Sequence, residues 1–81
     1  MKAVYEKLDD GKLVCQSEHP LPEEVLTASG QLKVGRYTIE FYQNNSPEDA
    51  KLRNIRMKNV PEDAVVLGSS TGIIVAIPTR Y

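Results

Sequence analysis

Basic side chains gather in one short stretch of the chain. Four cations fall within eight residues, at Lys51, Arg53, Arg56 and Lys58. Residues 53–60 alternate apolar and polar side chains, which predicts a half-buried strand with a basic outer face. A row of cations on such a face would bind a phosphate backbone or an acidic protein surface.

Two residues of the preceding strand are candidates for the same surface. In GRYTIEFYQNN, from Gly35 to Asn45, alternation places Arg36 and Tyr42 on the outer face. A ring that stacks under bases, beside cations that bind phosphates, is typical of single-stranded nucleic-acid binders. Three acids lie close in sequence and could neutralise these cations: Glu40, Glu48 and Asp49. A solvated face is therefore the first expectation, with single-stranded nucleic acid and an acidic protein partner as the alternatives.

No other group of residues predicts chemistry. Cys15 and His19 are the only Cys and His, whereas a structural zinc site takes four such ligands. The glycine- and serine-rich stretch 68–72 has the composition of a phosphate loop, but β-branched residues follow it where such a loop opens a helix. We therefore expect no enzymatic activity, no metal and no cofactor.

Composition and charge are those of an ordinary globular protein. Ten basic and eleven acidic residues give a net charge of -1, which is too small for long-range steering toward polyanions. The single Cys15 cannot form an intrachain disulfide, which fits a reducing compartment. The chain has no signal-like amino terminus and no apolar run of about 18–20 residues, so we expect a cytoplasmic protein without a membrane partner.

A hairpin is predicted at the amino-terminal end, in one of two registers. Residues 2–8 and 12–16 read as strands that flank Asp9-Asp10-Gly11. A two-residue loop at Asp10-Gly11 would place Val4, Leu8, Leu13 and Cys15 on one face. A three-residue loop with a glycine bulge would instead group Ala3, Tyr5, Leu13 and Cys15.

The middle of the chain predicts one short helix and one long strand. Pro22 at the first helical turn and Gly30 beyond the last favour a helix from Pro22 to Ala28. In the strand that follows, the bulky inner face is predicted at Tyr37, Ile39 and Phe41. Ser46 is predicted to be the N-cap of a single helical turn through Ala50.

The carboxyl-terminal part predicts a second hairpin that is buried on both faces. Residues 65–77 carry two apolar runs around the stretch 68–72, and they are continuous rather than alternating. In so short a chain, both faces of a strand are covered only inside a closed sandwich or barrel, or at a subunit interface. Val66, Ile74 and Ile77 are therefore candidates for self-association.

These elements predict a mainly β domain over residues 1–81, with five to six antiparallel strands in a small barrel or open sandwich and one short helix. A two-layer α+β arrangement is the alternative. A chain of 9.0 kDa buries only about 60% of its unfolded surface, so contact with a second copy would add stability. We expect a non-enzymatic interaction module, such as an adaptor, inhibitor or accessory protein, that binds a protein partner and forms a homo-oligomer through its carboxyl-terminal strands. Single-stranded nucleic-acid binding is the alternative function.

Overall fold

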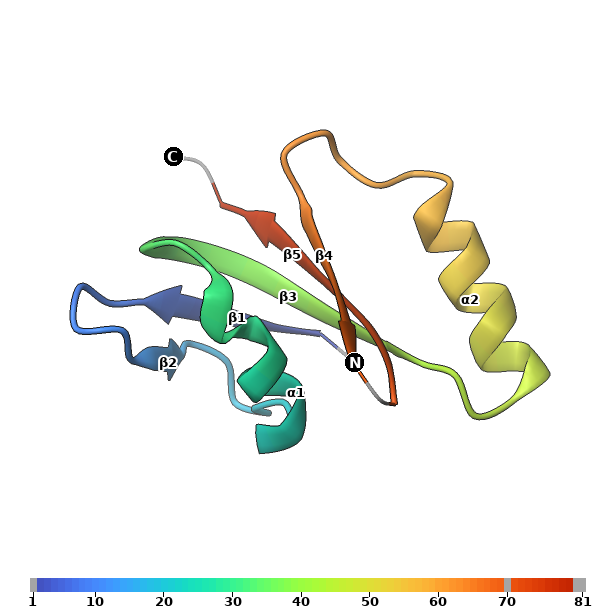
Figure 1. Cartoon of the computed structure of the whole chain (residues 1–81), viewed down its shortest axis with the longest axis horizontal. Coiled ribbons are helices and arrows are strands. Elements are labelled where there is room, and N and C mark those ends of the chain that lie inside the picture. The colour runs from blue at the N-terminus through green and yellow to red at the C-terminus, as the bar shows by residue number, and fades with distance from the viewer. Residues whose placement is uncertain (1, 70, 80–81) are drawn as a thin grey trace.

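One open antiparallel sheet is the frame of the protein, seen in a computed structural model that describes residues 2–69 and 71–79 (Figure 1). Its five strands have the order β2-β1-β3-β5-β4, so β2 and β4 form the two edges. The strands are β1 (Lys2–Lys7), β2 (Leu13–Cys15), β3 (Gly35–Gln43), β4 (Val65–Ser69) and β5 (Gly72–Pro78). The prediction of a mainly β fold is confirmed, in its open form rather than as a closed barrel.

The first hairpin adopts the register with the glycine bulge. Tyr5 pairs with Cys15, and the Leu8 N–H donates to the Lys12 carbonyl at 2.8 Å. Three residues therefore form the loop, and Gly11 takes φ of 89°, a left-handed conformation that glycine adopts without steric cost. The alternative two-residue loop is wrong.

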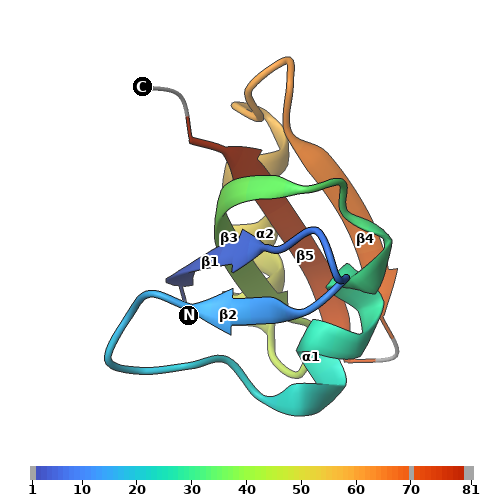
Figure 2. The same ribbon diagram turned by 90° about the vertical axis from the view of Figure 1, so that its left-hand side faces the viewer.

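The core lies on the concave face of the sheet. Helix α1 (Glu23–Ala28) and the 3-10 helix η1 (Ser29–Gln31) lie across this face, where α1 sits between β2 and β4 (Figure 2). The Tyr5 hydroxyl accepts a 2.7 Å hydrogen bond from the Leu21 N–H and so ties the segment before α1 to the sheet. The buried apolar residues on this side come from strands and from the α1 region: Ala3, Tyr5, Leu21, Val25, Leu32, Tyr37, Ile39, Phe41, Ile74 and Ala76.

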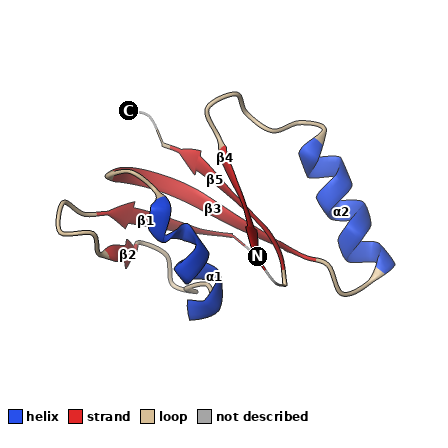
Figure 3. Ribbon diagram, in the orientation of Figure 1, coloured by secondary structure: helices blue, strands red, loops and turns tan. Residues whose placement is uncertain are grey.

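Residues 53–60 do not form the predicted strand, because most of them belong to helix α2 (Pro47–Met57; Figure 3). Ser46 caps this helix as predicted, since its Oγ accepts from the Asp49 N–H at 3.1 Å. The predicted single turn continues to Met57 because the sequence holds no glycine or proline between Pro47 and Pro61. The chain therefore has a second helix, and its basic residues lie around a helix rather than along a strand.

Helix α2 connects two parallel strands without packing flat against the sheet. β3 and β4 run in the same direction on either side of β5, to which both pair antiparallel. α2 lies beside one end of the sheet, and none of its residues is buried (Figure 1). Its apolar side chains therefore contribute little to the core.

Core packing predicts a large cost for shortening a central side chain. Ile39 is fully buried in β3, and we expect Ile39→Ala to lower the free energy of unfolding by about 2–5 kcal/mol through lost burial and a cavity. Urea denaturation measures this change. Val34, which is 60% exposed, supplies the control: Val34→Ala should change the free energy by less than about 0.5 kcal/mol. Equal effects of the two variants would contradict this core.

Candidate functional site

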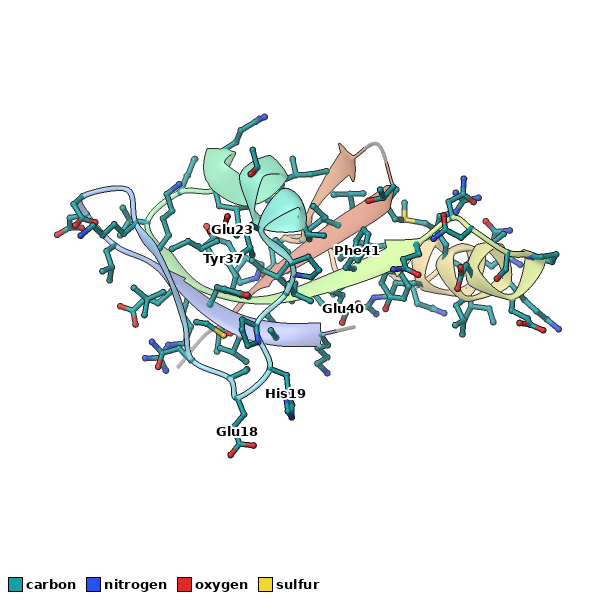
Figure 4. The ribbon with its side chains drawn as sticks, turned by 90° about the horizontal axis from the view of Figure 1, so that it is seen from below. Glu18, His19, Glu23, Tyr37, Glu40 and Phe41 are labelled. Atoms are coloured by element: carbon teal, nitrogen blue, oxygen red, sulfur yellow. The ribbon has the colours of Figure 1, made fainter. Side chains whose placement is uncertain are left out.

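Arg56 joins α2 to the outer face of β3. Its Nε lies 2.8 Å from Glu40 Oε1 and its Nη2 lies 3.2 Å from Oε2, so both carboxylate oxygens are engaged. Glu40 and Phe41 point to opposite sides of β3 (Figure 4). Although Glu40 lies on the outer face, it is only 7% exposed. A buried charge is stable only when it is paired, and Glu40 finds its partner in Arg56.

Tyr42 is held by the same carboxylate. Its hydroxyl donates to Glu40 Oε1 at 2.7 Å. Burial, which is the largest cause, and the hydrogen bond to Glu40 raise the pKa of Tyr42 to about 12. We call this group the Tyr42–Glu40–Arg56 cluster. It anchors the carboxyl-terminal half of α2 to the sheet by polar contacts.

The other predicted basic residues do not gather into one face. Arg36 lies at the opposite end of β3, where its Nη2 is 3.5 Å from Glu6 Oε1. Lys51 and Lys58 are seven residues apart and share one side of the helical path, whereas Arg53 lies near Arg56 on the opposite side. Of the six residues predicted for binding, the structure joins Tyr42 and Arg56 through Glu40 and leaves the other four without this link, because a helix distributes side chains that a strand would align.

The three candidates for self-association differ in exposure. Val66 is 39% exposed on the outer face of β4, and Ile77 is half-buried on β5. Ile74 is fully buried within the core of the single chain and does not reach the surface. The reason is the strand order, which places β5 between β3 and β4. Self-association itself stays a prediction.

Exposed apolar side chains gather instead on α2 and β4. Among the described residues, five of the seven large exposed hydrophobic side chains belong to these elements: Leu52, Ile55, Met57, Val65 and Val66. We call these five residues the α2–β4 surface, in which Val65 and Val66 project from opposite faces of β4. Leu52 and Ile55, which are 59% and 55% exposed, are three residues apart and share one side of the helix. The sequence prediction missed Leu52, although its spacing from Ile55 after the Ser46 cap was the available signal.

A hollow separates α2 from the end of β3. It has a volume of about 320 Å³ and is lined by Phe41, Tyr42, Gln43, Asp49 and Leu52. Leu52 therefore faces open space instead of a packed neighbour. This hollow accounts for the exposure of Leu52.

The geometry gives little support to a catalytic or metal site at Cys15 and His19. The Cys15 thiol donates to the Ser17 carbonyl at 3.2 Å, and His19 is exposed on a loop that points away from the sheet (Figure 4). Across residues 2–69 and 71–79, no three His, Cys, Asp or Glu side chains are grouped to hold a metal ion. No helix in the same part of the chain is both long and apolar enough to cross a membrane.

Comparison of the chain with family models, with curated proteins and with solved structures finds no match in any of the three. The α2–β4 surface and the Tyr42–Glu40–Arg56 cluster are therefore the features from which a function can be inferred.

Removing the charge of Glu40 should loosen α2. We expect Glu40→Gln to lower the free energy of unfolding by about 1–3 kcal/mol, because Arg56 loses a charged acceptor in a poorly solvated place. Amide hydrogen exchange in α2 should also become faster. Glu48→Gln changes an exposed acid of the same helix and is the control. Equal exchange rates in the two variants would show that Glu40 does not anchor α2.

The raised pKa of Tyr42 predicts a loss of stability at high pH. The folded protein keeps this proton up to about pH 12, whereas the unfolded chain releases it near pH 10. The associated stability is therefore fully present below about pH 10 and is lost as pH rises to about 12. Tyrosinate absorbance and urea denaturation over this range measure both effects. Tyr42→Phe should remove the transition near pH 12, and an unchanged titration would contradict the assignment.

Proposed function

We propose that the protein is a small, non-enzymatic interaction module that works as a self-associated assembly, and that the α2–β4 surface contacts a second copy of the chain. The observation that carries this proposal is the exposure of five large apolar side chains on two consecutive elements. Apolar side chains that gather outside the core are typical of protein contact sites. An adaptor or accessory role follows from this class of activity.

The charges beside the apolar residues of α2 support a protein contact. Glu48 lies four residues before Leu52, and Lys51 lies four residues before Ile55. All four residues therefore share one side of the helix. A surface with charges of both signs can complement a second copy of itself. It suits a phosphate backbone less well, because Glu48 would repel the phosphates.

The alternative of single-stranded nucleic-acid binding has weaker support. The Arg56 guanidinium and the Tyr42 hydroxyl are both engaged by Glu40, and Arg36 lies at the far end of β3 beside Glu6. A nucleic acid would thus have to bind to separated lysines and Arg53. We therefore favour protein contact over nucleic-acid binding.

Light scattering after size exclusion tests the proposal. We expect a mass of about twice 9.0 kDa at high protein concentration, and this mass should persist at high salt because the contact is apolar. Val66→Lys should leave the fold intact, since Val66 is exposed, and should shift the mass to 9.0 kDa. A wild-type mass of 9.0 kDa at every concentration would contradict the proposal.

Val14 offers a matched control on the other edge of the sheet. It is 40% exposed on β2, close to the 39% of Val66 on β4. Val14→Lys therefore introduces the same charge at similar exposure and should leave the mass unchanged. Equal effects of the two variants would place the contact outside the α2–β4 surface.

A further inference from the structure

Strand β4 is an edge strand whose own sequence lacks the usual protection, although α1 contacts it from the concave side. Its five residues, VVLGS, include no charge and no proline, and the pairing from Val65 to Ser69 continues without a bulge. Natural sheets usually blunt an exposed edge with one of these devices or with a very short strand. The opposite edge, β2, follows this rule because it has only three residues. β4 is therefore the edge at which another strand could add.

The strand register settles which backbone groups of β4 face outward. The Thr71 carbonyl accepts from the Asn44 N–H, and the Thr79 N–H donates to the Arg36 carbonyl. Alternation along β5 then directs the N–H and C=O groups of Ile74 and Ala76 toward β4, where these residues pair with Leu67 and Val65. The N–H and C=O groups of Val66 and Gly68 consequently point to the free edge.

We infer that β4 pairs antiparallel with β4 of a second copy, with Val66 opposite Gly68 of that copy. This inference rests on the proposed function and names the contact within it. A two-fold axis would pass beside Leu67, and the two strands would exchange four N–H···O=C bonds through Val66 and Gly68. The two sheets would become one continuous antiparallel sheet with the two β4 strands at its centre.

The residues around β4 favour this register over the two registers in which the second strand is shifted along β4. A shift that pairs Val66 with itself would need the Ala64 N–H, which already donates to the Pro61 carbonyl at 3.1 Å. The opposite shift pairs Gly68 with itself and leaves Val66 without a partner among the residues of the strand, which is Val65–Ser69.

Side-chain size also fits the inferred register. A Cβ built on Gly68 meets no atom within 4 Å, so the space beside it is open for Val66 of the second copy. The paired segment from Val65 to Ser69 holds no charged residue, so no like charges meet. An uncharged strand with a small residue opposite a larger one is thus complementary to itself.

A cysteine at position 67 tests the contact. Residues that face each other in a non-hydrogen-bonded antiparallel pair have Cα atoms about 4.5 Å apart, which a disulfide can span. In a Cys15→Ser background, mild oxidation of Leu67→Cys should yield a covalent dimer on a non-reducing gel. Val65→Cys is the matched control on the same strand and face. Two copies of position 65 would lie about 13 Å apart, so its cross-linking should be at least ten-fold slower.

Three outcomes separate this inference from the proposed function. Rapid cross-linking of Leu67→Cys alone, in a folded dimeric protein, supports the inferred pairing. A dimeric mass without this cross-link, or with equal cross-linking of Val65→Cys, overturns the inference and leaves self-association standing. A monomeric mass at all concentrations overturns both. Should Leu67→Cys fail to fold, amide exchange of Val66 and Gly68 in the wild-type protein decides, because the pairing requires both amides to be protected in the assembly and exposed on dilution.

Discussion

Backbone hydrogen bonding is the constraint on which this structure depends. Each N–H and C=O that leaves water must find a partner, and a five-stranded open sheet satisfies this need everywhere except along its two edges. The path of the chain decides which strands are left at the edges. Because β3 continues through α2 into β4 before the chain returns as β5, β5 takes the interior position and β4 the outer one. The concave face is covered by α1, while no further strand pairs with the outer edge of β4.

The charged contact between Glu40 and Arg56 gives α2 a different relation to the sheet from that of α1. α1 is held by buried apolar residues such as Val25, whereas α2 has no buried residue and is tied by its Arg56 side chain. An ion pair can fix the position of a helix without burying the apolar side chains of that helix. Leu52 and Ile55 are therefore left on the surface, which links the packing of this helix to the proposed self-association.

The sequence predicted the elements whose signals are local. The Asp-Gly pair predicted the first hairpin, and proline and glycine marked the short helix α1. Alternation from Tyr37 to Phe41 identified the inner face of β3. α2 was missed beyond its first turn because it buries no face against the core, so its apolar residues lack the periodicity of a packed helix. Ile55 and Met57, two residues apart, resembled a strand instead.

Strand order was the part that local patterns could not supply. Continuous hydrophobicity in residues 65–77 predicted two strands that are buried on both faces. This prediction is right for β5, where Ile74, Val75 and Ala76 are buried, and wrong for β4, where Val65 and Val66 are exposed. Ile74 and Val66 therefore looked alike, although one is fully buried and the other is 39% exposed. The six residues of the predicted basic surface lie apart for a related reason. Their grouping assumed that residues 53–60 form a strand beside β3, whereas most of these residues belong to α2.

The central claim is that β4 completes its hydrogen bonding with a second β4. The most direct measurement is an isotope-filtered NMR experiment on a mixture of labelled and unlabelled chains, which detects contacts between copies alone. The account predicts a cross-peak between the Val66 amide proton of one copy and the Gly68 amide proton of the other. A dimeric sample in which the contacts between copies involve other residues, and not these two, would contradict it.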